Sequence, residues 1–99
     1  MEIDYKTVHV DKTYRYISAP DWKATTPIVD YNTWCEANLL YVVPTTKKLH
    51  LRPDTNLVVC NWIRDVCKGY WTRSVIDVGL IHYRFELRND AIMFKLKWG

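Results

Sequence analysis

The stretch that decides the fold reads Leu80-Ile81-His82-Tyr83-Arg84-Phe85-Glu86-Leu87-Arg88. Its apolar residues alternate with polar or charged ones from Ile81 onward. A period of two is typical of a β-strand with one buried face, so we expect a strand over residues 80–88. Asn89 and Asp90 then break the alternation, and an apolar segment follows them to the end of the sequence.

The segment 90–98 has two interpretations. As a helix, it is capped by Asn89, has Asp90 in its first turn, and has Lys95 and Lys97 in its last turn. This interpretation puts three apolar residues on one face, namely Ala91, Phe94 and Trp98. As a strand, it alternates Ile92, Phe94, Leu96 and Trp98 against the residues between them, with Asn89 and Asp90 as a hairpin turn. The helix is favoured because alanine, methionine, leucine and lysine are good helix formers, and the strand stays open as the alternative.

The residues from Phe85 to Gly99 form a pattern that resembles a known group of proteins. The pattern is carried by Phe85, Arg88, Asp90, Ala91, Phe94 and the run Lys95-Leu96-Lys97-Trp98-Gly99. It resembles the end of small uncharacterised proteins of tailed bacteriophages, in which a strand is followed by an Asp-Ala-x-x-Phe-x-Leu-x-Trp segment. Residues 32–36, Asn-Thr-Trp-Cys-Glu, resemble a Trp-Cys helix found upstream in such proteins. The resemblance implies a viral origin and a small α+β domain, and it implies no activity and no functional residue.

The first half of the chain predicts short elements. Residues 2–10 and 14–17 read as a β-hairpin, and residues 18–27 as a loop that holds Trp22. A helix capped by Asp30 or Asn32 is expected to run to about Leu40, with an apolar stripe made of Tyr31, Trp34, Cys35 and Leu39.

Two short strand patterns follow this helix. Residues 40–43 are apolar and are expected to end at Pro44. Residues 47–52 alternate again, so the two pieces form a possible hairpin around Thr45 and Thr46.

The longest helical pattern begins at Asp54 or Thr55 and ends near Gly69, which suits a C-cap. Its stripe is formed by Val59, Trp62, Ile63, Val66 and Tyr70. A strand over residues 71–76 then turns through residues 77–79 into the stretch quoted first. These elements predict a single domain over residues 1–99 of the α+β class, with a mainly antiparallel sheet and two or three helices packed on one face.

Composition narrows the class of protein. The net charge of +3 lies wholly in residues 50–99, which carry eight basic and five acidic groups. This bias is weaker than that of a dedicated nucleic-acid binder. No apolar run reaches the length of a membrane span, and the acidic start is unlike a secretion signal. We therefore expect a cytoplasmic or virion protein that is neither secreted nor membrane-bound, with its three cysteines reduced.

Catalytic and metal-binding patterns are weak in this sequence. Cys60 and Cys67 are seven residues apart, and the three histidines are scattered, so zinc-ligand spacing is missing. Three glycines do not make a phosphate loop. Cys35 is expected in the first turn of its helix, where its pKa could fall, so cysteine chemistry is kept as the alternative to a non-enzyme. The expectation is no metal, no cofactor and no catalytic residue.

Aromatic and arginine residues favour a binding role. Five Trp and seven Tyr in 99 residues exceed what a small core requires, and Trp, Tyr and Arg dominate interface hot spots. We expect an accessory protein, encoded by a phage as the resemblance implies, that binds a host or viral protein. The expected anchors are Trp22, Lys23, Trp71, Arg73 and Arg84. The alternative is a nucleic-acid surface made of His82, Arg84, Arg88, Lys95 and Lys97. Self-association is left open.

Overall fold

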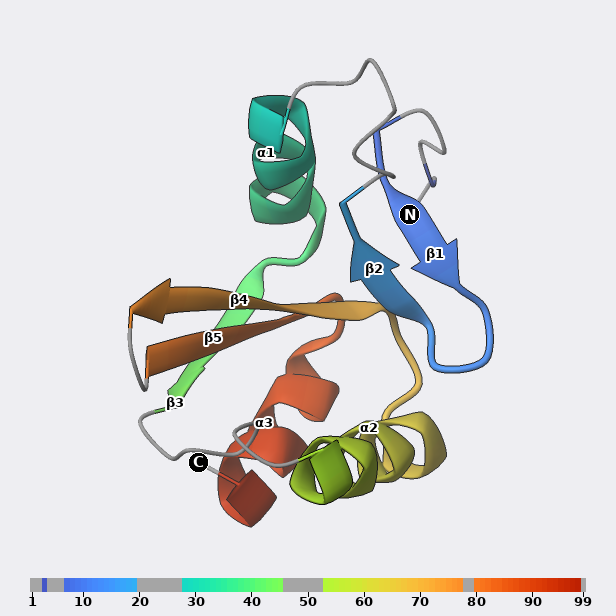
Figure 1. The fold of residues 1–99 in the computed structure, drawn as a ribbon. Helices are drawn as coiled ribbons and strands as arrows, with labels where there is room; N and C mark the ends of the chain where they lie inside the picture. The colour runs from blue at the N-terminus through green and yellow to red at the C-terminus, as the bar shows by residue number, and fades with distance from the viewer. Residues whose placement is uncertain (1–2, 4–6, 20–27, 46–52, 78–79, 99) are drawn as a thin grey trace.

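The computed structural model describes residues 3, 7–19, 28–45, 53–77 and 80–98 (Figure 1). In chain order the elements are β1 (His9–Asp11), β2 (Tyr16–Ser18), α1 (Ile28–Asn38), β3 (Tyr41–Thr45), α2 (Pro53–Val66), β4 (Trp71–Asp77), β5 (Leu80–Phe85) and α3 (Arg88–Trp98). The predicted α+β class is confirmed. The strand predicted over residues 47–52, Trp22 and its loop, and residues 78–79 of the predicted turn lie outside the described residues.

The sheet is mixed but mostly antiparallel, with the strand order β1-β2-β4-β5-β3. The pairs β1–β2, β4–β5 and β3–β5 are antiparallel. The pair β2–β4 is parallel and is registered through Tyr16 and Trp71. The predicted N-terminal hairpin is therefore confirmed as β1 and β2, but β1 begins only at His9, and residues 2 and 4–6 of the predicted first strand lie outside the described residues. The hairpin joins the rest of the sheet through a short contact.

Strand β3 runs past the residue that was expected to end it. Pro44 lies inside β3, opposite His82 of β5. Among the described strands β3 stands at the end of the order, and proline is tolerated on an edge strand because the amide that it lacks need not join the ladder. The expected stop at Pro44 was therefore wrong.

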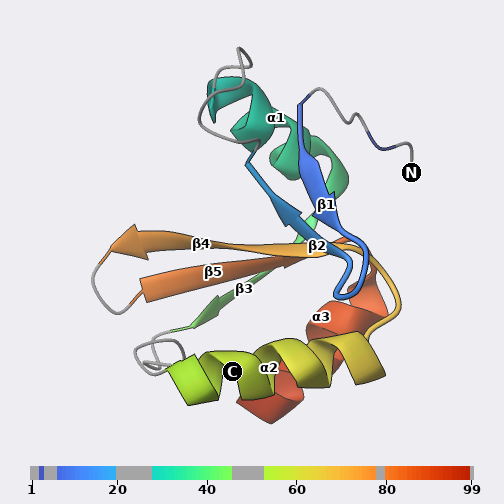
Figure 2. The same cartoon turned by 45° about the vertical axis from the view of Figure 1, so that its right-hand side comes forward.

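The helices cover both faces of the sheet (Figures 1 and 2). Helices α2 and α3 pack on one face, which agrees with the expectation of two helices on one face. Helix α1 lies against the opposite face, so the third helix does not join them. The alternation in β5 explains this arrangement. Ile81, Tyr83 and Phe85 are buried in one core with residues of α2 and α3, whereas His82 and Arg84 line a pocket with α1.

Phe94 is at the centre of the core beneath α2 and α3. Its ring centroid lies 4.4 Å from that of Tyr83, 5.2 Å from Phe85 and 6.2 Å from Trp62. Each such aromatic pair stabilises the fold by about 0.5–1.5 kcal/mol beyond its buried area. The segment 90–98 is therefore a helix, because only a helix buries Ala91 and Phe94 together while Leu96 stays 83% exposed. The strand alternative is wrong.

A smaller core lies between α1 and the N-terminal hairpin. It is formed by Val8, Ile17, Tyr31, Cys35 and Leu39, so the predicted stripe of α1 is confirmed. Helix α1 begins at Ile28, earlier than the predicted caps. Two hydrogen bonds join this core to β4: the Tyr31 hydroxyl lies 3.0 Å from Thr72 Oγ1, and Thr72 donates to the Ile17 carbonyl at 2.6 Å.

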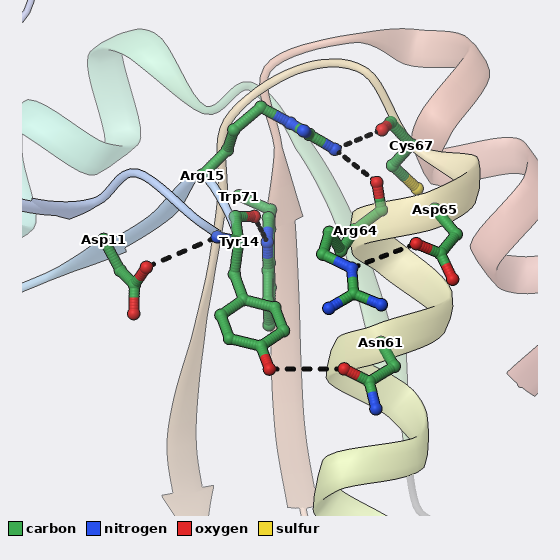
Figure 3. A network of polar contacts seen from close by, with 8 residues as sticks. All are labelled: Asp11, Tyr14, Arg15, Asn61, Arg64, Asp65, Cys67 and Trp71. Carbon is green, nitrogen blue, oxygen red and sulfur yellow. Dashed lines mark hydrogen bonds and ion pairs between the residues drawn. The ribbon is translucent and has the colours of Figure 1, made fainter.

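The end of α2 is held by the hairpin turn, as Figure 3 shows. Arg15, which has a φ of 58°, donates through its guanidinium to the carbonyls of Arg64 and Cys67. A cation at these last carbonyls is favoured by the helix dipole. The Tyr14 hydroxyl donates to Asn61 Oδ1 at 3.2 Å, and Trp71 Nε1 donates to the Tyr14 carbonyl at 2.9 Å.

Gly69 was expected to cap α2, but it lies three residues beyond the end of the helix. Its role is close packing. A Cβ atom at this position would lie 2.8 Å from Leu87 Cγ and 2.9 Å from Glu86 Oε1. Any side chain here would therefore push the segment between β5 and α3 away from the end of α2.

Candidate protein-docking surface

Helix α3 has apolar residues on two opposite faces. The inner face buries Ala91 and Phe94 and half-buries Trp98, as the sequence predicted. The outer face carries Ile92, Met93 and Leu96, which are 45%, 41% and 83% exposed. At 3.6 residues per turn, these three lie within an arc of roughly 100°, opposite the inner face. We call them the α3 outer stripe.

A pocket of about 450 Å³ adjoins the stripe. It lies between the end of α2 and the start of α3, and its lining includes Val66, Lys68, Leu87, Arg88, Asp90 and Met93. We call it the α2–α3 pocket. Met93 belongs both to this pocket and to the α3 outer stripe, so the two features form one continuous surface.

Asp90 fixes the geometry of the pocket. Its side chain is 3% exposed, and its carboxylate accepts hydrogen bonds from the backbone amides of Lys68, at 3.1 and 3.2 Å, and Gly69, at 2.9 Å. Hydrogen bonds to a charged acceptor are roughly twice as strong as neutral ones. Asp90 therefore serves the first turn of α3, as predicted, and also ties that turn to the chain that leaves α2.

The border of this surface is basic. Lys68, Arg88, Lys95 and Lys97 are exposed. Asp90 is the one acidic residue of α3, and it is buried. On the helical wheel Arg88 and Lys95 lie on one side of the stripe and Lys97 on the other. The surface thus combines exposed aliphatic side chains with positive charge on both sides.

The residues expected to bind nucleic acid are divided by the sheet. Arg88, Lys95 and Lys97 belong to α3, whereas His82 and Arg84 lie on the opposite face beneath α1. There they line a pocket of about 320 Å³ together with Tyr31, Asn32, Cys35, Glu36 and Ser74. Arg84 donates to the Leu39 carbonyl at 3.1 Å, so it holds the end of the α1 region. The five residues therefore do not share one surface.

The residues expected to anchor a protein partner differ in how exposed they are. Trp71 is 1% exposed and cannot meet a partner in this fold, which corrects its assignment to a docking surface. Arg73 is half-buried, with its guanidinium 5.7 Å from the Tyr16 ring centroid and 5.9 Å from that of Trp71. Arg73 and Trp71 therefore pack against each other at the edge of the core. Trp22 and Lys23 lie outside the described residues.

Cys35 lies well inside α1, because the helix begins at Ile28, so its expected place in the first turn was wrong. Burial raises the pKa of its thiol, which is the opposite of what a cysteine nucleophile needs. His82 and Cys35 line the same pocket, but the thiol stays protonated at neutral pH. Within the described part of the chain, no three histidine, cysteine or acidic residues converge where they could hold a metal ion.

Fold and surface together define a small α+β domain with an exposed apolar stripe on α3 that is bordered by cations. No protein-family model, curated protein or solved structure matches the chain. None of the described helices has the length and apolar character needed to cross a membrane.

Sequence reasoning missed the α3 outer stripe, although its signal was present. Ile92, Met93 and Leu96 fall on one side of a helix at spacings of one and four residues. In the strand alternative Ile92 and Leu96 belong to the apolar face, whereas the helical prediction named only the buried face made of Ala91, Phe94 and Trp98. A wheel of residues 88–98 that considers both sides of the helix finds the stripe directly.

Proposed function

We propose that this chain is a binding module that docks on a protein partner through the α3 outer stripe and the α2–α3 pocket. The observation that carries the proposal is the second apolar face of α3. A surface helix normally has one apolar face toward the core and a polar face toward water. A continuous exposed apolar patch with a polar border is typical of an interaction site.

The composition of the stripe supports this role. Met93 is adaptable, and methionine is common on surfaces that accept partners of different shape. Leu96 is the most exposed of the large apolar residues in the described part of the chain. The surface is thus more aliphatic than the aromatic one expected from composition. Because residues 85–99 resemble the end of small tailed-bacteriophage proteins, the proposed partner is a host or viral protein.

Binding to nucleic acid is less favoured, because the cations suggested for it lie on two faces of the sheet. An apolar stripe also adds nothing to phosphate contacts, which depend on charge. The enzyme alternative at Cys35 is likewise less favoured, because its thiol is protonated at neutral pH.

The test compares two exposed leucines. Leu96→Ser removes the centre of the stripe, and Leu57→Ser makes the same change on α2, where Leu57 is 54% exposed. The tagged chain is used to capture proteins from bacterial lysate after nuclease treatment, with circular dichroism as the check on folding. We expect one stoichiometric protein to bind the wild type and the Leu57→Ser variant, and to bind Leu96→Ser roughly tenfold more weakly, a loss of about 1.4 kcal/mol.

Equal capture by both variants would show that the stripe is not the docking surface. Capture that is seen with untreated lysate but lost after nuclease treatment would favour the nucleic-acid alternative instead.

A further inference from the structure

We infer that the partner presents an acidic amphipathic helix, with its apolar side against the α3 outer stripe and one large apolar side chain in the α2–α3 pocket. This inference rests on the proposed function and adds the chemistry of the partner. It follows from the charges around the stripe, from the way in which β3 ends the sheet, and from the pocket beside Met93.

The charges select an acidic partner. Arg88 and Lys95 lie on one side of the stripe, Lys97 lies on the other, and Lys68 lies at the pocket. Among the described residues that form the stripe and line the pocket, the one carboxylate belongs to Asp90 and is already bound to two backbone amides. A partner with carboxylates on either side of its own apolar stripe meets a cation on each side. A basic partner meets repulsion at the same places.

The same charges disfavour a second copy of the chain as the occupant. A symmetric dimer places the same patch of both copies in contact. Lys95 and Lys97 of one copy would then lie near the same cations of the other, with no exposed acidic residue on α3 to separate them. The geometry therefore points to a different chain.

The shape of the surface selects a helix over an extended segment. An extended partner binds best by adding a strand to a sheet edge, but at the β3 edge Pro44, the fourth of five residues in this strand, lacks an amide for such pairing. The stripe instead lies on one side of helix α3 and spans residues 92–96, about 6 Å along the helix axis. A second helix packs on such a face by fitting its side-chain ridges into the grooves of the first.

The α2–α3 pocket supplies an anchor point at one end of this contact. Its apolar lining comes from Val66, Leu87 and Met93, and its polar lining includes Lys68 and Arg88. A large apolar side chain that enters here leaves the acidic neighbours of that side chain close to both cations. This combination of a central apolar anchor and a charged border is typical of the energetically dominant part of an interface.

Two synthetic peptides test the inference with the full chain. Both are helix-forming peptides of about 18 residues with leucines on one face at helical spacing. One carries glutamate at the remaining charged positions and the other carries lysine. Fluorescence anisotropy measures the Kd of each, and amide NMR shifts locate the contact. We expect the acidic peptide to bind at least about tenfold more tightly, with shifts along α3, and its binding to weaken with added salt.

Charge reversal sharpens the result. In the double variant Arg88→Glu with Lys97→Glu, we expect the preference between the two peptides to reverse. Lys12→Glu changes an exposed lysine in the turn between β1 and β2 and should leave the preference unchanged.

The outcomes separate the inference from the proposed function. If both peptides bind along α3 with equal Kd, and Leu96→Ser weakens both, the docking surface stands and the acidic partner is wrong. If neither peptide shifts the α3 signals, the inference is overturned, and the capture experiment decides the proposed function by itself. Self-association of the wild type that Leu96→Ser abolishes would make a second copy the occupant. If a single-stranded oligonucleotide shifts the NMR signals of α3 equally in the wild type and in the Leu96→Ser variant, the ligand of this surface is nucleic acid and the acidic helix is wrong.

Discussion

The two faces of the sheet are covered in different ways. The face under α2 and α3 is filled by interlocking rings, with Phe94 among Tyr83, Phe85 and Trp62. The face under α1 is smaller, and polar groups contribute much of its contact, as in the bonds that join Tyr31, Thr72 and Ile17. The difference shows which helix has apolar residues that the core does not use. Helix α3 packs on the core through Ala91, Phe94 and Trp98, so the α3 outer stripe does not contribute to this packing.

The comparison predicts a difference in stability between the two cores. Phe94→Ala should lower the free energy of unfolding by about 3–5 kcal/mol, because it removes the ring at the centre of the larger core. Leu39→Ala, at a fully buried position in the smaller core, should cost less, about 2–3 kcal/mol. Urea denaturation measures both values. If Leu39→Ala costs as much as Phe94→Ala, the two cores are equal and the comparison fails.

Alkaline pH tests the buried thiol that each core contains. Burial, with a smaller contribution from the charge of Asp90, raises the pKa of Cys67 to about 12, and burial raises that of Cys35. Below about pH 7.5 both thiols are protonated in the folded and unfolded states. Above this pH the unfolded chain releases protons that the folded chain keeps, so stability falls as the pH rises.

Each buried thiol contributes up to about 1.4 kcal/mol per pH unit to this fall. Urea denaturation between pH 8 and 11 under reducing conditions should therefore give a shallower pH dependence for Cys67→Ala than for the wild type. A slope identical to that of the wild type would mean that Cys67 ionises freely in the folded protein.

The smallest effect is expected at the hydrogen bonds of the α1 face. Tyr31→Phe removes the hydroxyl that meets Thr72 and should cost about 0.5–1.5 kcal/mol. Tyr41→Phe makes the same change at a residue that is 38% exposed, and it should cost less than 0.5 kcal/mol. Thermal unfolding followed by circular dichroism can compare the two. Equal midpoints would show that the bond to Thr72 does not contribute to stability.

Local patterns were sufficient for much of this fold. The alternation that predicted a strand over residues 80–88 is confirmed as far as Phe85, where β5 ends. The stripe of α1 and the helical spacing around Val59 and Ile63 are likewise set by neighbours in the chain, so the sequence predicts them. The helix over residues 90–98 was favoured for the same reason. What decided between helix and strand was Phe94, whose place among the rings of β5 and α2 depends on tertiary packing.

Long-range pairing set the limits of prediction. The pairing of β3 with β5 and the place of Pro44 on an edge depend on strands that are far apart in sequence. Trp71 and Arg73 were chosen as anchors because Trp and Arg are common in interface hot spots, and residue type alone does not reveal burial. In the structure they share the core-facing side of β4, and Trp71 donates to the Tyr14 carbonyl. Arg15 caps α2 from the N-terminal hairpin, and no spacing in the sequence signals such a contact.

The most direct test of the account follows methyl groups on the two helices that cover the larger core. Methyl NMR of the chain is recorded alone and with the purified captured partner. The account predicts that the methyl signals of Ile92, Met93 and Leu96 shift, while those of Leu57 and Val58 on α2 stay in place. Shifts at Leu57 and Val58, or around the pocket under α1, with an unchanged α3 outer stripe would contradict it.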